Sequence, residues 1–423
     1  MPETLSPGVA LTEEAVLAHA HRRGEPEFLV ERRRLALETW NSLPLPGRQD
    51  EIWRRVRLGE VDLAAVTAGP YPDDAPTLSR TKVRGGFWGD VARAVRELPA
   101  LLKAHWATTV YPAGETAKAR RGGKFHALNQ ALFDSGYVLH LPPGAKADAP
   151  FHAVCHAPPS AAASFPHHLV VLDEGAEATL IEEHRGTGGA LLNPQTEIVL
   201  GPGARLHYIL LQTAGPAQTY IGAHRARLQR GAHMTLSGAY LGARLSKTFL
   251  EAELAEPGAE ALLYGLYHGR GKQQTHLDTW QHHVAPGCRS DLLFKGVLDD
   301  AAYAVYRGMI RLEPGAQKTD AYQQNRTLLL STDACMHSIP GLEICADDVR
   351  CTHGATAGQV DPEMLFYLRS RGLTLSQARK AIVDGFLEDV LLRFQVPGVI
   401  ASLREQLAAR MDGTFSPVGR RPT

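Results

Sequence analysis

The chain has 423 residues, of which 44% are hydrophobic and 21% are charged. These fractions are typical of globular proteins and exclude global disorder, while the length is that of two or three domains. The 45 Lys and Arg residues balance 45 Asp and Glu residues, so the basic excess of a protein that wraps nucleic acid is absent. The sequence therefore indicates a globular protein with a sizeable core and no nucleic-acid partner.

Targeting signals and cysteine usage indicate where such a chain works. No apolar run reaches the roughly 18 residues that predict a transmembrane helix. Residues 1–20 are acidic and interrupted by proline, unlike a secretory signal. The five cysteines are an odd number in a long chain, which fits a reducing compartment better than a disulfide framework. We therefore expect a cytoplasmic protein with no membrane partner.

The N-terminal region, residues 1–110, has the pattern of a helical segment. Thr12 can cap a first helix, and a second helical run spans residues 27–41. The Pro-rich residues 69–76 are typical of a linker, and a further helical segment over residues 90–108 leads out of the region.

Glycine-marked turns recur through the middle of the chain at a nearly constant interval. The dipeptide Pro-Gly falls six times between residues 140 and 345, and Gly175 and Gly231 divide the two long gaps. The eight turn glycines are then spaced 26 to 31 residues apart: Gly144, Gly175, Gly203, Gly231, Gly258, Gly287, Gly315 and Gly341. A period of about 20–50 residues is typical of stacked-repeat architectures.

The repeating unit has the alternation of a strand. Apolar residues occupy every second position after the turns, as in Leu206, Tyr208 and Leu210, and the same alternation follows Gly258. Helical solenoids would show apolar spacings of three and four instead. We therefore expect a mainly β fold class, a right-handed parallel β-helix over residues 111–360 between two helical segments. An antiparallel sandwich with coincidental turns is the alternative.

The last segment, residues 361–423, returns to a helical pattern. Asp361 followed by Pro362 is typical of a helix start, and Gly372 of a helix end. A longer helix that Ser376 can cap and a final helix follow.

Motifs for nucleotide and hydrolytic chemistry are incomplete. Gly271-Lys272 lacks both the upstream glycine and the following Ser or Thr of a phosphate-binding loop. The sequence contains neither Gly-x-Ser-x-Gly nor His-Glu-x-x-His. We therefore expect this chain to bind no nucleotide and to act without catalysing a reaction.

The 19 histidines raise the question of a metal site. His167-His168 and His282-His283 are neighbours in sequence, and neighbours on a strand point to opposite faces. Neither pair therefore makes a chelate, and hydrogen-bonded or solvated histidines are the simpler interpretation.

Two Cys-x-His sequences have a better spacing for ligands. Cys335 with His337, and Cys351 with His353, would lie on one face of a strand, about 6.5–7 Å apart. Thiolate and imidazole suit iron, zinc or copper, but two ligands do not close a four-ligand site. Each pair is at best half a site. The second pair lies where the repeats end, at an edge that a partner can pair with.

The stretch from Leu342 to Thr356, LEICADDVRCTHGAT, resembles the SufB/SufD family of the SUF iron–sulfur cluster assembly system, and within it the D subunit (SufD). The likeness covers about residues 120–395, with Cys335 and His337 in a stretch that varies in the family. The pair Cys335 and His337 is therefore interpreted as incidental. Further matching stretches are residues 294–300, 317–325 and 365–372.

The resemblance implies a scaffold subunit of a cytoplasmic complex with a paralogous SufB-like subunit and two copies of a SufC-like ABC ATPase. B subunits typically have Glu where this chain has Gly354, which favours the D subunit. His353 is implied to join a B-subunit cysteine at a transient iron–sulfur cluster, with Cys351 as its neighbour. The resemblance also permits a bound reduced flavin, and we expect that the isolated chain can form a homodimer.

Two surfaces are expected to contact these partners. The strand from Ile344 to Cys351, which includes Val349, should lie at an exposed edge and pair with the B subunit. The resemblance assigns ATPase docking to the apolar helix after Asp361, with the residues Leu365, Phe366, Tyr367, Arg369 and Arg371. Two other functions stay open from the residues alone: a β-helix enzyme acting on polysaccharide, and a stand-alone metal-binding solenoid.

Overall fold

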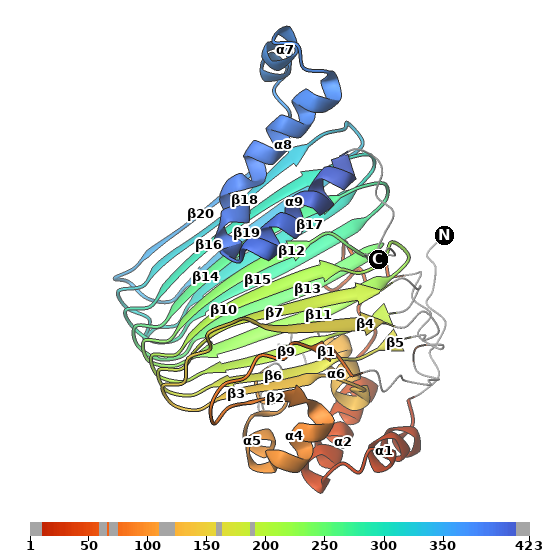
Figure 1. Cartoon of the computed structure of the whole chain (residues 1–423), viewed down its shortest axis with the longest axis vertical. Coiled ribbons are helices and arrows are strands. Elements are labelled where there is room, and N and C mark those ends of the chain that lie inside the picture. The colour runs from red at the N-terminus through yellow and green to blue at the C-terminus, as the bar shows by residue number, and fades with distance from the viewer. Residues whose placement is uncertain are drawn as a thin grey trace.

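The computed structural model describes residues 11–58, 66, 75–109, 123–157, 163–186 and 191–411. Most of the expected linker at residues 69–76, and the tail from residue 412, lie outside the described residues. The described chain forms two facing sheets with helices at both ends (Figure 1).

Each sheet is a stack of parallel strands with one antiparallel strand at its N-terminal edge. Sheet A consists, in spatial order, of β1 (Thr77–Leu78), β4 (Phe151–Ala157), β7 (Glu177–Gly186), β10 (Arg205–Thr213), β12 (His233–Tyr240), β14 (Glu260–Gly269), β16 (Arg289–Leu298), β18 (Asp320–Leu329) and β20 (Arg350–Gln359). Sheet B consists of β2 (Phe87–Asp90), β3 (Tyr137–Leu141), β6 (His167–Leu172), β9 (Gln195–Leu200), β11 (Thr219–Leu228), β13 (Leu245–Leu254), β15 (Gln274–His283), β17 (Tyr303–Leu312) and β19 (Cys335–Ile344), with the short β5 (Ala163–Ser164) and β8 (Leu191–Leu192) beside it.

The pairing register shows that each coil contributes one strand to each sheet. In sheet A, Arg205 pairs with Glu177 on one side and with His233 on the other. In sheet B, Glu197 pairs with Leu169 and with Arg225 in the same way. Partners are therefore one sequence repeat apart, and the mainly β, parallel β-helix fold is confirmed.

The predicted turn glycines lie where the chain passes from sheet B to sheet A. Six of them, from Gly144 to Gly287, have φ between +63° and +73°, a conformation that a Cβ atom disfavours. Gly315 lies in the seventh turn, where Lys318 has the positive φ instead.

Pro340-Gly341 does not mark a turn, so this part of the prediction is wrong. The dipeptide lies inside β19, and the chain turns at residues 345–349 instead. A Cβ atom on residue 341 would come within 2.8 Å of Cε of Met309. A side chain at this position would require the end of the Met309 side chain to move, so close packing rather than chain reversal favours this glycine.

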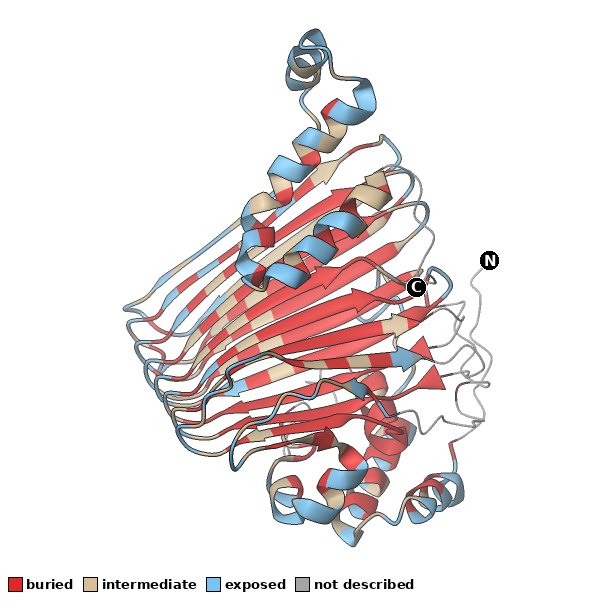
Figure 2. Cartoon of the chain, in the orientation of Figure 1, coloured by how far each residue is buried: buried red, intermediate tan, exposed pale blue. Residues whose placement is uncertain are grey.

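The interior between the two sheets is the main hydrophobic core (Figure 2). Leu206, Tyr208 and Leu210 point into it and are no more than 1% exposed, as their alternation predicts. The opposite parity of sheet A faces outward, where Leu266 and Val297 are nevertheless buried.

The C-terminal helices cover this outer face of sheet A (Figure 1). They are α7 (Pro362–Ser370), α8 (Leu375–Leu391), the 3-10 helix η1 (Leu392–Phe394) and α9 (Pro397–Met411). Leu387 of α8 and Leu403 of α9 join Leu266 and Val297 in one apolar cluster. In contrast, α7 projects beyond the sheets (Figure 1).

Local capping explains where these helices begin and end. Asp361 caps α7, and Gly372 follows its end with φ of +94°, as predicted. Ser376 does not cap α8. Thr374 does, because its hydroxyl accepts from the backbone of Gln377 while the Gln377 side chain accepts from the Thr374 backbone.

The N-terminal helices gather at the opposite end of the molecule (Figure 1). Thr12 caps the first helix, as predicted. The expected helix over residues 90–108 is two short helices, because Pro99 begins a new one. The described helices of this region are α1 (Glu13–Arg22), α2 (Glu27–Ser42), α4 (Val91–Glu97), α5 (Pro99–His105) and α6 (Gly123–Leu132). The division into segments 1–110, 111–360 and 361–423 stays a prediction.

The two ends of the solenoid differ. At the N-terminal end, β1 and β2 pair antiparallel with β4 and β3, and the Trp88 ring packs 5.2 Å from the rings of both Tyr137 and Phe151. At the other end, β19 and β20 are the last strands of their sheets. None of the helices in the described part of the chain combines the length and apolar character needed to cross a bilayer.

Candidate functional site at the open end of the solenoid

The terminal strand β20 presents an unpaired edge. The N–H of Arg350 donates to Thr319 O on the β18 side. In a parallel ladder alternate residues bond to the same neighbour, so the N–H groups of Cys351, His353 and Ala355 face away from β18. Ten residues at about 3.3 Å each make an edge of about 33 Å. A long exposed edge of this kind is a template for pairing with another chain.

The other terminal strand, β19, has a blunted edge. The N–H of Cys335 donates to Ala302 O on the β17 side. The backbone N–H groups of the even-numbered residues of β19 therefore point away from β17, toward the open edge. Pro340 occupies one of these positions, where its missing N–H breaks no bond within the sheet. Proline at such a position discourages pairing along β19.

Cys351 and His353 lie on one face of β20, as their spacing predicts. Their ladder partners on β18 are Ala321 and Gln323, both 1% exposed. Cys351 packs against the apolar cluster that includes Ala321, and burial raises the pKa of its thiol to about 11. The His353 residue is exposed. The pair therefore lies at the mouth of the interior, with the thiol partly covered and the imidazole open.

The expected strand from Ile344 to Cys351 does not exist, so this prediction is corrected. Ile344 ends β19, Val349 lies in the turn, and β20 begins at Arg350. Five residues must carry the chain across from sheet B to sheet A, which leaves no room for a continuous strand. Ile344 is 43% exposed, and Val349 packs partly on the cluster below Cys351.

The Cys335 and His337 pair is not brought together with Cys351 and His353. Met336, which lies between them, packs on the interior core, so its neighbours point to the outer face of sheet B. There Sγ of Cys335 lies 3.7 Å from Nε2 of His337. The two Cys-x-His pairs therefore face different sides of the molecule.

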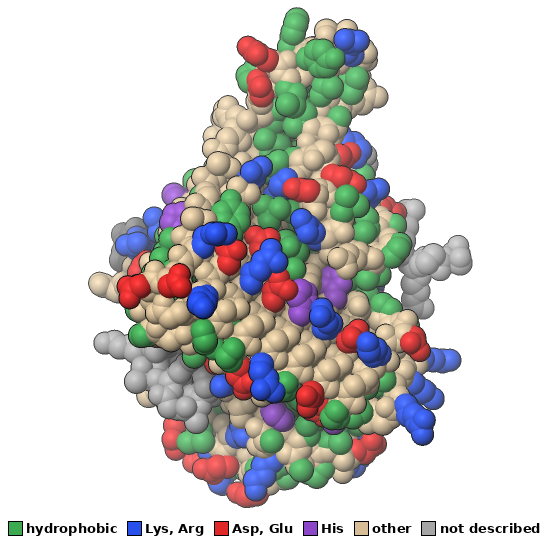
Figure 3. Space-filling model, turned by 90° about the vertical axis from the view of Figure 1, so that its left-hand side faces the viewer, with side chains coloured by type: hydrophobic (Ala, Val, Ile, Leu, Met, Phe, Trp, Pro, Cys, Tyr) green, Lys and Arg blue, Asp and Glu red, His purple; other side chains and the backbone are tan. Residues whose placement is uncertain are grey.

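The helix α7 is a second candidate surface. None of its residues is buried, and Phe366 and Tyr367 are 75% and 56% exposed. The Arg371 guanidinium lies over the Tyr367 ring, 5.1 Å from its centroid. Figure 3 shows hydrophobic side chains on the projecting end where α7 lies. Leu365 is half-buried, whereas Arg369 and Arg371 are exposed.

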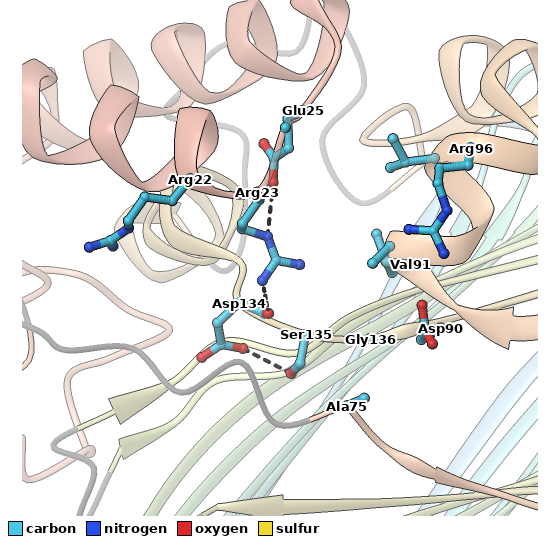
Figure 4. Close-up of a pocket in the computed structure, with 13 residues that line it drawn as sticks. Arg22, Arg23, Glu25, Ala75, Asp90, Val91, Arg96, Asp134, Ser135 and Gly136 are labelled. Atoms are coloured by element: carbon cyan, nitrogen blue, oxygen red, sulfur yellow. Dashed lines mark hydrogen bonds and ion pairs between the residues drawn. The ribbon is translucent and has the colours of Figure 1, made fainter.

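A cavity of about 350 Å³ between α1, α4 and residues 134–136 is a weaker candidate (Figure 4). Arg23 pairs with Glu25 and also donates to the backbone oxygen of Asp134, and the Ser135 hydroxyl donates to the Asp134 carboxylate. Arg23 and Glu25 therefore neutralise each other at one wall of the cavity.

The sequence analysis missed one group of potential ligands. Cys155, His168 and His184 are buried together between the first coils of the two sheets. His167 and His168 do point to opposite faces, as predicted: His167 contacts Gln130 of α6, whereas His168 faces the interior. The sequence repeat indicates part of this group, because Cys155 and His184 are one coil apart and pair directly.

These features define the class of protein: a two-sheet parallel β-solenoid with a closed N-terminal end, an open C-terminal end and a thiol–imidazole pair at its mouth. Residues 155–386 match the family model described as "SUF system FeS cluster assembly, SufBD core domain". The chain belongs to this SufB/SufD family.

Curated relatives support this assignment along most of the chain. An iron–sulfur cluster assembly SufBD family protein of Synechocystis is 28% identical over 95% of this chain and 94% of its own length. The iron–sulfur cluster assembly protein SufD of Bacillus subtilis is 24% identical over 94% of this chain and 97% of its own length. A SufBD family protein of Mycobacterium leprae is 31% identical over 58% of this chain and 64% of its own length.

Proposed function

We propose that this chain is the D-type scaffold subunit of a cytoplasmic iron–sulfur cluster assembly complex. In this proposal β20 pairs with a SufB-like subunit, and α7 docks a SufC-like ABC ATPase. A nascent cluster forms at the first of these interfaces, with His353 as this chain's ligand and a cysteine of the partner completing the site. The cluster is the cargo of the complex, and nucleotide is bound by the ATPase rather than by this chain.

The observation that carries the proposal is the open end of the solenoid. A ten-residue edge with outward N–H groups offers main-chain hydrogen bonds to a matching strand. The thiol and imidazole lie within this edge, so a partner that pairs with β20 necessarily comes close to both. Two ligands from one chain leave a metal or cluster incomplete, which makes a shared site the natural arrangement.

Gly354 supports the assignment to the D type. Its Cβ position has no atom closer than 3.6 Å, so packing does not demand glycine there. B-type sequences typically carry Glu at this position. Since the space around Gly354 would accept a side chain, the glycine serves here as a sequence marker of the D type. A bound reduced flavin remains part of the proposal only as a permitted cofactor, since the described residues do not identify its site.

The experiment is co-purification with the B-type subunit and the ATPase, followed by measurement of iron and sulfide content. In Ala355→Pro the lost N–H faces outward, so the bond pattern with β18 is kept while the pairing edge is interrupted. We expect the B-type subunit to be lost from the complex. Ala355→Ser, which keeps the N–H, is the matched control. Equal recovery of the partner in both variants would contradict edge pairing.

His353→Ala tests the cluster site in the same experiment. Alanine offers no donor atom, whereas a neutral imidazole can ligate iron. We expect assembled complexes with strongly reduced iron, sulfide and visible charge-transfer absorption. His337→Ala, on the last coil of the other sheet, should load clusters normally. Wild-type loading in His353→Ala would show that this histidine is not a ligand.

A further inference from the structure

A group of buried polar side chains lies inside the solenoid near its closed end, far along the chain from Cys351 and His353. Cys155 on β4, His184 on β7 and His168 on β6 each offer one ligand atom, and these atoms all lie within 4.8 Å of one another. Cys155 is 3% exposed, and the two histidines are fully buried. Titratable groups of this kind are costly to bury unless they are paired or bind a metal.

The backbone register fixes this arrangement. Cys155 and His184 are direct ladder partners on neighbouring strands of sheet A, so their side chains lie next to each other on the inner face. His168 points toward them from sheet B, with Nε2 lying 3.6 Å from Sγ of Cys155. A tetrahedral zinc ion with ordinary bond lengths holds sulfur and nitrogen ligands about 3.6 Å apart.

Glu182 lies beside this group and contacts His184, although its carboxylate is not among the mutually close ligand atoms. It is fully buried, and its Oε1 lies 3.0 Å from Nε2 of His184. The hydroxyls of Tyr137 and Thr196 donate to this carboxylate and hold it in place. A thiolate and a carboxylate together balance the charge of a divalent cation, so the occupied site would carry no net charge in the core.

His184 is oriented for ligation. Its Nδ1 lies 2.9 Å from the Tyr220 hydroxyl, a contact of the kind that orients metal-binding histidines. Its Nε2 is buried and, within the described chain, has no hydrogen bond of good geometry. This nitrogen faces the space shared with Glu182.

We propose that Cys155 and His184, with His168 from the opposite sheet and the Glu182 carboxylate beside them, form an internal binding site for a thiophilic divalent cation of the Zn²⁺ or Fe²⁺ class. Binding replaces the Cys155 S–H bond with a sulfur–metal bond, and the thiol proton leaves to solvent. The site is independent of the proposed cluster site and does not rest on the proposed function.

His168 contributes less than the other ligands. The backbone N–H of Tyr137 donates to Nδ1 of His168, so in the metal-free protein the ring proton sits on Nε2, the nitrogen that faces Cys155. Ligation through Nε2 requires the proton to move to Nδ1 and the Tyr137 hydrogen bond to break. Replacement of His168 should therefore weaken metal binding less than replacement of His184.

The test uses Co²⁺ as a spectroscopic probe on the full chain with Cys335, Cys345 and Cys351 replaced by serine. These three positions are not buried, so their replacement should leave the fold intact. Of the remaining cysteines, Cys155 is in the proposed site, whereas Cys288 belongs to no group of ligands in the described chain. We expect one Co²⁺ per chain, tetrahedral ligand-field bands, a thiolate-to-cobalt charge-transfer band, and displacement by Zn²⁺.

Further variants in this background separate the ligands. Cys155→Ser should abolish the charge-transfer band, and His184→Gln should weaken Co²⁺ binding by about tenfold or more, with His168→Gln affected least. If Cys155→Ser fails to fold, X-ray absorption of the parent protein should show one sulfur in the first shell of cobalt. Absence of the band, or a first shell without sulfur, would overturn the proposal.

Discussion

Cys351 and His353 share one face of β20 but differ in readiness to bind a metal. Burial raises the pKa of the Cys351 thiol to about 11, so at neutral pH the metal-free thiol is almost entirely protonated. The imidazole of His353 is exposed, where a partner can reach it. The structure thus gives a chemical reason to place the histidine ahead of the cysteine in the proposed cluster site.

The protonated state of Cys351 can be measured in the isolated chain. Because the thiolate is the nucleophile, a thiol of pKa about 11 should react with iodoacetamide at pH 8 about 100-fold more slowly than an ordinary thiol. Peptide mapping after timed alkylation measures this rate, with the exposed Cys345 as internal control and the unfolded chain as reference. Equal rates for Cys345 and Cys351 in the folded chain would contradict the assigned burial.

Spacing rules predict some of these residues and miss others for a clear reason. The i, i+2 rule places Cys351 and His353 on one face because both belong to one strand. The group around Cys155 comes from three strands, and its assembly depends on the length of each coil. Only the pair Cys155 and His184, one repeat apart, could have been found from the sequence. His168 required knowledge of how the two sheets face each other.

At the scale of elements, α7 is unusual because none of its residues is buried, although its sequence is apolar. Deletion of everything after Asp361 is a poor test of docking. It would also remove α8 and α9, whose Leu387 and Leu403 cover Leu266 on sheet A. Point substitutions on α7 separate docking from folding.

We expect the double variant Phe366→Ser/Tyr367→Ser to bind the ATPase at least tenfold more weakly, because exposed aromatic residues are common binding hot spots. Its stability should change by only about 0.5 kcal/mol, since neither side chain is buried. Calorimetric titration and thermal unfolding measure the two effects. Leu35→Ser on α2, another exposed apolar residue (51%) at the opposite end, is the control. Unchanged affinity in the double variant would remove α7 from the docking surface.

The sequence predicts the elements well where local chemistry decides them. Six of the eight predicted turn glycines have positive φ. These turns, the Asp361 cap and the strand alternation reflect local preferences, and they are confirmed. Thr374-x-x-Gln377 is a capping box, and its reciprocal hydrogen bonds place the helix start two residues before Ser376, the predicted cap. Pro340-Gly341 was wrongly predicted as a turn because an edge strand tolerates proline where a central strand does not. Which strands lie at an edge is known only from the fold.

At the scale of the whole molecule, histidines that are buried or partly buried make stability depend on pH. Burial lowers the pKa of His19 and His207 from 6.5 to about 4, and that of His283 to about 3. The unfolded chain therefore takes up protons at these positions below pH 6.5, while the folded chain does not. Their contribution to stability is fully present above pH 6.5 and is lost as the pH falls toward 4.

Each of these histidines should reduce the free energy of unfolding by about 2 kcal/mol between pH 7 and pH 5. Urea unfolding at the two pH values measures the total loss. His207→Gln should lose about 2 kcal/mol less than wild type, whereas His156→Gln, at an exposed position of β4, should match wild type. A loss in His207→Gln as large as in wild type would show that His207 titrates normally in the folded chain.

The difference between the two solenoid ends determines how many solenoids can join end to end. A parallel solenoid with two open ends could add subunits indefinitely, because every new terminal coil repeats the same template. Here Trp88 and the antiparallel strands β1 and β2 close one end, and Pro340 blunts half of the other. Among the strands of the described chain, β20 is the long edge that remains open to pair with another solenoid. Growth through this contact therefore stops at two solenoids, whether the second is a paralogue or another copy, and the open edge favours a defined pair over a fibre.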